Sequence, residues 1–192
     1  MRGSVPTKTM LSVASLAHVV VGIAGARPLE QSRRFPWRAA MALIAVSLMP
    51  DLDVLAFRFG ISYSAPFGHR GATHSLVFAL VAGTGTALAV ANGRRRDFWR
   101  VAIVICLVAV SHPLLDALTD GGLGVALLRP FSNARFFAPW RPIPVAPIGA
   151  RMLSDRGLRV IAVEALWSLP VFVWAMWPRR AGRTDSGGAT DS

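Results

Sequence analysis

The stretch FWRVAIVICLVAVSHPLLDAL, residues 98–118, decides the fold. This apolar run is close to the ~20 residues that an α-helix needs to cross ~30 Å of hydrocarbon. His112 and Asp116 nevertheless lie toward its end. An ionisable side chain at the centre of a membrane helix costs about 2.5–3.5 kcal/mol on insertion scales, so such residues usually pair with one another or act in a functional site. The stretch therefore predicts a membrane helix that carries part of a polar site.

Four more apolar segments of similar length flank this one. They are residues 10–26, 37–57, 73–91 and 158–177. None alternates with the period of two that a membrane strand requires. We therefore expect an all-α protein, a multi-pass transmembrane helical bundle of about five helices. The first segment also has a signal-peptide pattern, with Lys8 before it and AGA at its end, but His18 in its middle favours a retained helix.

The segments predict one membrane-embedded domain over residues 1–183. The connection at residues 119–157 is long and rich in proline and aromatic residues, so we expect it to fold back over the mouth of the bundle. The tail at residues 184–192 is small and polar, and we expect it to be disordered.

Composition and charge favour a bilayer as the partner of this chain. Hydrophobic residues make up 53% of the sequence and charged residues only 16%, and 20 of the 21 basic residues are arginines. The net charge of +11 is spread between the apolar runs, which favours membrane headgroups over nucleic acid. Cys106 is the single cysteine, which excludes an internal disulfide and a cysteine-rich zinc site.

Arginine clusters predict the orientation. They follow the first and third segments and end the fifth, which places all three on one side of a five-helix bundle. The positive-inside rule assigns that side to the cytoplasm. We therefore expect the N-terminus to lie on the non-cytoplasmic side.

Histidines and aspartates gather near one end of the expected helices. They are His18, Asp51 and Asp53 in PDLD, His69 and His74 in HRGATHS, and His112 and Asp116 in SHPLLD. The last two are four residues apart, which places both side chains on one helix face. In an up-and-down bundle, the end of the second segment, the start of the third and the end of the fourth share one membrane face. That face is the non-cytoplasmic one.

The local sequence suggests how these side chains turn inward. Pro50 disrupts the second helix just before its two aspartates. Gly71 predicts a turn, with Thr73 as the N-cap of the next helix and His74 in its first turn. Imidazoles and carboxylates without thiolates suit a divalent ion such as Zn²⁺, Mn²⁺ or Fe²⁺. Each residue alone could instead form a structural hydrogen bond. Their occurrence together on one predicted membrane face favours a metal site.

We expect a division of roles within this set. The expected inner ligands are Asp53, His74, His112 and Asp116. His18, His69 and Asp51 either support those ligands or bind a second ion. A carboxylate that does not bind the ion, Asp51 first, could act as general base. Arg70, beside a helix N-terminus, suits the charge of an anionic substrate.

In this order, the pieces resemble a known family. His18, PDLD, HRGATHS, SHPLLDALTDGG and LLRPFSNARFF…PWRPIPV together resemble the YdjM-type family of inner-membrane metal-dependent hydrolases, over residues 16–145. The resemblance implies a multi-pass protein of the bacterial inner membrane with metal-dependent hydrolase activity. The resemblance also implies that the residues of the family's motif are, in this chain, His18, Asp51, Asp53, His69, Arg70, His74, His112 and Asp116. It supplies no substrate.

The function expected from the sequence is a membrane-bound metal-dependent hydrolase. A site at headgroup level would suit a lipid or a lipid-linked phosphoester, although enzymatic activity itself stays open. The alternatives are an ion-coupled transporter, because buried His and Asp also form ion and proton sites, and a non-catalytic membrane protein with a structural metal. The metal and the oligomeric state are not indicated by the sequence.

Overall fold

A computed structural model describes residues 16–29, 36–90, 95–145, 147 and 153–178. Within these residues the chain is all-helical, with five α-helices and no β-strand, as predicted. The α-helices are α1 (Leu16–Ala26), α2 (Trp37–Leu48), α3 (Leu76–Val90), α4 (Arg95–Ala117) and α5 (Asp155–Met176). Three 3₁₀-helices join them: η1 (Arg27–Leu29), η2 (Met49–Phe59) and η3 (Ala72–His74). The predicted tail lies outside the described residues, and the single domain stays a prediction.

Three of the five expected spans are long and apolar enough to cross a membrane. They are Trp37–Phe59, Phe98–Ala117 and Asp155–Met176. Two apolar helical segments are shorter, Leu16–Leu29 and Leu76–Val90. The third span is shorter than predicted because Thr73 and His74 belong to η3, a separate turn before α3. Part of the first expected span lies outside the described residues.

Small residues let the helices pack closely. Alanines form most of the buried core. The larger residues of this core are Leu43, Val46, Ile105 and Val108. A Cβ atom added at Gly22 of α1 would lie 2.7 Å from the Cα atom of Ile44 in α2. Small interface residues of this kind are the usual means of close approach between helices in membranes. Helix α1 packs against α2, α4 and α5, whereas α3 packs against α4.

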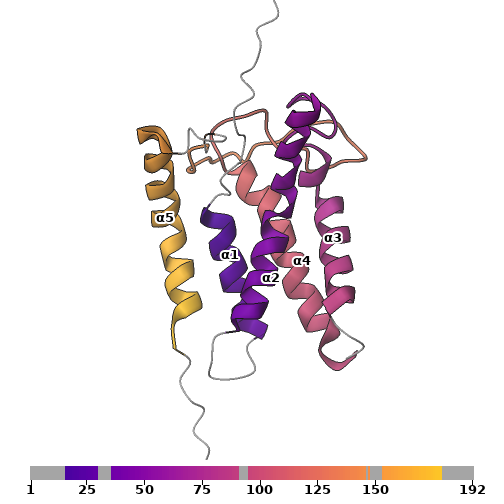
Figure 1. The fold of residues 1–192 in the computed structure, drawn as a ribbon, viewed down its shortest axis with the longest axis vertical. Coiled ribbons are helices and arrows are strands. Elements are labelled where there is room, and N and C mark those ends of the chain that lie inside the picture. The colour runs from indigo at the N-terminus through magenta and orange to yellow at the C-terminus, as the bar shows by residue number, and fades with distance from the viewer. Residues whose placement is uncertain (1–15, 30–35, 91–94, 146, 148–152, 179–192) are drawn as a thin grey trace, which may run out of the picture.

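The α4–α5 connection covers one end of the helical bundle and leaves the other end uncovered by it (Figure 1). At one end, the α4–α5 connection crosses over the ends of the helices beside η2 and η3. There the Ala126 N–H donates to the Arg70 carbonyl, and the Leu76 N–H donates to the Leu127 carbonyl. At the other end, Arg27 donates to three carbonyls near the end of α5, those of Trp174, Ala175 and Trp177. The candidate site lies at the end covered by the long connection.

Candidate metal centre

Helix α4 contributes two side chains from one face. The Nε2 atom of His112 lies 3.9 Å from Oδ2 of Asp116, one turn further along the helix. Both residues are buried, with exposed fractions of 0% and 6%. The spacing of four residues therefore gives the shared face that the sequence predicts.

The two aspartates of PDLD face different neighbours. Helix α2 ends at Leu48, and Pro50 lies at the start of η2. A 3₁₀-helix turns about 120° per residue, so residues two apart point in different directions. Asp51 consequently faces His112 and His74, whereas Asp53 faces His69, Thr73 and the other side of His74.

The turn before α3 delivers His74. Ser75 caps the helix, because its hydroxyl oxygen accepts the Phe78 N–H at 3.0 Å. The expectation that Thr73 is the N-cap is wrong: its hydroxyl donates instead to Oδ2 of Asp53 at 2.7 Å. Since the helix begins after Ser75, His74 is free to turn into the interior, where it is fully buried.

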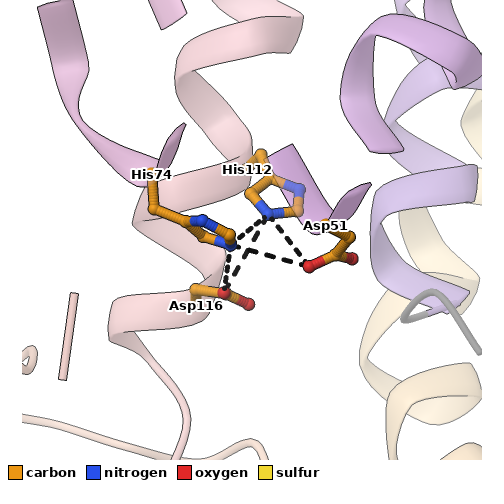
Figure 2. A group of neighbouring side chains, drawn as sticks. All are labelled: Asp51, His74, His112 and Asp116. Carbon is orange, nitrogen blue, oxygen red and sulfur yellow. Dashed lines mark hydrogen bonds and ion pairs between the residues drawn. The ribbon is translucent and has the colours of Figure 1, made fainter. Parts of the chain in front are cut away.

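Asp51, His74, His112 and Asp116 form one compact group (Figure 2). Each offers one ligand atom, and the four atoms all lie within 4.8 Å of one another. The two Nε2 atoms of the histidines are 3.0 Å apart. Oδ1 of Asp51 lies 3.6 Å from each of them, and Oδ2 of Asp116 lies 3.3 Å from His74 Nε2. A tetrahedral ion with bonds of ~2.0–2.1 Å would set its ligand atoms about 3.3 Å apart, so the spacing fits.

Neighbouring groups orient both imidazoles for this role. Nδ1 of His112 donates to the Ser47 carbonyl at 2.6 Å. Nδ1 of His74 donates to Oδ2 of Asp53 at 3.0 Å. A proton held on Nδ1 leaves Nε2 with the lone pair that an ion requires. The donor set therefore fits a divalent ion.

The negative charge of the group also favours a cation. Burial alone would lower the pKa of His74, but its contacts with Asp116, Asp51 and Asp53 outweigh that effect and raise the pKa well above the ordinary value. Three carboxylates around one imidazole thus attract positive charge, either a proton or a metal ion. The group therefore has the charge of a site that could hold a cation.

A second group, Asp53 with His69 and His74, is also close enough to hold an ion. Its carboxylate oxygens, however, already accept several hydrogen bonds. Oδ1 accepts from Nδ1 of His69 at 2.7 Å, and Oδ2 accepts from the Arg70 N–H, Thr73 and His74. From the sequence, we expect Asp53 as an inner ligand and Asp51 as a supporting residue, a ligand of a second ion or the general base. The Oδ2 atom of Asp53 faces hydrogen-bond donors, whereas Oδ1 of Asp51 faces the Nε2 atoms of both histidines.

His18 reaches the group from α1. Its ring stacks on that of His112, with centroids 4.0 Å apart, and its Nε2 lies 3.4 Å from Oδ1 of Asp116. Asp116 therefore contacts His18 through one oxygen and His74 through the other. This places His18 beside the four-residue group rather than within it.

Arg70 is held in an unusual conformation. Its φ angle is 61°, a left-handed value that is uncommon for any residue except glycine. Its guanidinium group donates to the Thr119 hydroxyl at 2.8 Å and the Gly121 carbonyl at 3.1 Å, and Nε lies 3.1 Å from Oδ2 of Asp116. Arg70 is 5% exposed. It therefore neutralises charge inside the site.

Arg135, from the long connection, supports this turn. Its guanidinium group donates to the carbonyls of His69, Arg70, Gly124 and Tyr63 at 3.2–3.4 Å. One planar side chain thereby ties the α2–α3 loop to the α4–α5 connection. The connection folds back as its sequence predicts, whereas no sequence pattern marks Arg135 among its several arginines.

Glu164 is a further buried ionisable residue, outside the set of histidines and aspartates expected from the sequence. It lies within α5 and is 2% exposed, although α5 is otherwise one of the apolar candidate spans. The rule that draws attention to His112 and Asp116, an ionisable residue within an apolar run, applies equally to Glu164. Glu164 is the only carboxylate in residues 158–177, so no spacing with a second acidic or histidine residue draws attention to it.

Fold and site together define a class: a helical membrane protein with a buried His/Asp group that could hold a metal ion. The YdjM inner membrane protein family matches residues 13–181, and the chain belongs to this family. It is 43% identical to the inner membrane protein YbcI of Escherichia coli (strain K12) over 158 residues, which cover 78% of this chain and 88% of the relative. No solved structure matches the chain.

Proposed function

We propose that this protein is a membrane-bound metal-dependent hydrolase that acts on a lipid or lipid-linked phosphoester. The observation that carries the proposal is the group of four ligand atoms, contributed by η2, η3 and α4, within 4.8 Å of one another. Membership of an inner membrane protein family supports the setting. A divalent ion activates a bound water, and a neighbouring carboxylate can accept its proton, which are the two elements of metal-assisted hydrolysis.

The proposal assigns the ion to His74, His112 and Asp116. The side chains of these three are at most 9% exposed, whereas the side chain of Asp51 is 16% exposed. Asp51 is therefore the member that water reaches most easily, which supports the role of general base. A bound divalent ion would supply Lewis-acid chemistry and a water of lowered pKa. Asp53 and Ser47 would hold the two imidazoles.

Arg70 takes a different role from the one that its sequence position suggests. Because it is buried and paired with Asp116, Thr119 and Gly121, it would orient Asp116 rather than capture a distant substrate. Its positive charge would also stabilise negative charge that develops at the reacting group.

The substrate class and the orientation are inferred from the ends of the helices. Phe59, Phe67, Phe131 and Trp140 are exposed in the segments that surround the site, which suits the level of lipid headgroups. Arg27 in η1 and Arg38 in the first turn of α2 lie at the opposite end of these helices. We infer that the chain is a multi-pass protein and that the site faces the non-cytoplasmic side.

One observation favours a second candidate, a non-catalytic protein with a structural metal. His74 and His112 are fully buried, and a closed set of four protein ligands is typical of structural ions. The role of Asp51 separates the two candidates. As a fourth ligand it would close the site, and as a general base it would leave one position open for water.

Metal content and turnover, measured on the same purified protein, test the proposal. We expect one divalent ion per chain by mass spectrometry, and release of phosphate or headgroup from vesicles of phosphatidic acid and phosphatidylglycerol that stops on chelation. Asp51→Asn should retain the ion and lose turnover. Metal without turnover would favour the structural ion. Two ions per chain would assign one to the Asp53 group, and no ion would favour a carrier.

A further inference from the structure

Glu164 lies against the N-terminal turn of α1. Its Oε2 accepts the Leu16 N–H at 2.7 Å, and Leu16 is two residues before His18. A buried carboxylate within an apolar helix is costly unless it is paired or used. One backbone hydrogen bond leaves most of the acceptor capacity of a carboxylate unused. Glu164 therefore requires further polar neighbours.

A small cavity supplies those neighbours. It has a volume of about 30 Å³, and its polar lining comprises Glu164, His18, Arg70, Asp116 and Thr119. The lining thus includes Asp116 of the metal group together with residues of α1, α5 and the loops. A cavity needs roughly 10–15 Å³ on this measure to hold one water molecule, so one or two waters fit.

Two buried atoms of the same lining have unused hydrogen-bonding capacity. Among the described residues, Nδ1 of His18 has no hydrogen-bond partner, although His18 is 1% exposed. Nε of Arg70 lies near Asp116 as an ion pair but makes no aligned hydrogen bond. Buried polar atoms are rarely left in this state, and ordered water is the usual partner.

We propose that this cavity binds water that links Glu164 to His18 and Asp116, and that Glu164 is thereby a positioning residue of the metal centre. The inference rests on the proposed function only in that a metal ion occupies the neighbouring group. Asp116 directs Oδ2 toward His74 and Oδ1 toward His18. Water bound to Glu164 donates to Oδ1 of Asp116 and so holds the carboxylate in one orientation. In that orientation Oδ2 of Asp116 points toward the ion. Residues that orient metal ligands in this way typically contribute 10–100-fold to metal affinity.

The direct test is Co²⁺ binding by the full-length protein in detergent, followed by visible absorption. Glu164→Gln keeps an oxygen for the Leu16 N–H but removes the charge. We expect about 10-fold weaker Co²⁺ binding and a shifted absorption band. Ser168→Ala is the matched control, because Ser168 is buried one turn further along α5 and lies outside the cavity lining. It should bind Co²⁺ like the wild type.

A second variant tests the water itself. Ile143 also lines the cavity, and Ile143→Phe would displace water while leaving Glu164 in place. We expect a similar loss of Co²⁺ affinity, and no further loss when the two changes are combined, because both remove the same link. Glu164→Gln still decides the question if Ile143→Phe does not fold.

The outcomes distinguish this inference from the proposed function. A wild-type protein that binds no Co²⁺ would overturn the metal centre, and the role of Glu164 with it. A wild type that binds Co²⁺, with Glu164→Gln unchanged in affinity and spectrum, would overturn only the role of Glu164. An equal loss in Ser168→Ala would reduce that role to packing of α5 and overturn it as well.

Discussion

Two neighbouring groups use the same residue types in different ways. In one, Asp51, His74, His112 and Asp116 turn lone pairs toward a common point. In the other, the Asp53 carboxylate accepts hydrogen bonds from His69, Thr73 and the Arg70 N–H. The aspartates are only two residues apart, and the 3₁₀ geometry of η2 separates them. Histidine and aspartate therefore indicate an ion only where hydrogen-bond donors have not already taken the oxygens.

The largest expected effect distinguishes the two groups directly. His112→Gln removes a ligand atom from the first group, whereas His69→Gln removes only a hydrogen-bond donor to Asp53. We expect His112→Gln to lose metal by more than the ~10–100-fold typical of a supporting residue, and His69→Gln to stay within that range. Metal content of the purified variants measures both. Equal loss in the two variants would mean that the second group also holds an ion.

Asp53→Asn should have the next largest effect. The change keeps the size of the side chain but weakens acceptance from His74 Nδ1, so the imidazole is less firmly oriented. We expect metal affinity to fall about 10–100-fold without complete loss. A competition titration with a chromogenic chelator measures the change. Complete loss of binding would instead make Asp53 an inner ligand, as the sequence pattern suggests.

The sequence predicted the helical class and the contributing segments, because long apolar runs and ionisable residues within them are local signals. The i, i+4 spacing of His112 and Asp116 likewise gave a shared face. The division between Asp51 and Asp53 could not be predicted, since it depends on η2 continuing as a 3₁₀-helix for 11 residues. The contacts of Arg135 and Glu164 join segments far apart in the chain, so no local pattern reports them.

Arg135→Lys should have a smaller effect on the same centre. Lysine keeps the positive charge but cannot contact four carbonyls with one planar group. The turn that bears His69 and Arg70 would loosen, while every ligand of the first group remains present. We expect a few-fold loss of metal affinity, which is less than the ~10–100-fold typical of a residue that directly holds a metal ligand. Arg141→Lys is a suitable control, because Arg141 is exposed and stacks on Phe137 instead.

The smallest effect on metal is expected in the apolar half of the bundle. A Cβ atom added at Gly83 would lie 3.0 Å from the Cα atom of Cys106, whereas one at Gly85 would meet nothing within 4 Å. Gly83→Ala should therefore push α3 from α4 and lower thermal stability, by about 1–3 kcal/mol for an overpacked contact. Gly85→Ala should leave stability unchanged or raise it, because alanine favours the helix.

Neither glycine variant should change metal affinity, since neither contacts the site. Thermal unfolding in detergent, with and without added metal, measures stability and binding together, because a ligand of the folded state raises the apparent stability. The metal-induced shift should be equal in the wild type and both variants. A smaller shift in Gly83→Ala alone would show that the α3–α4 contact positions His74 and His112. The packed half and the polar half would then be a single coupled unit.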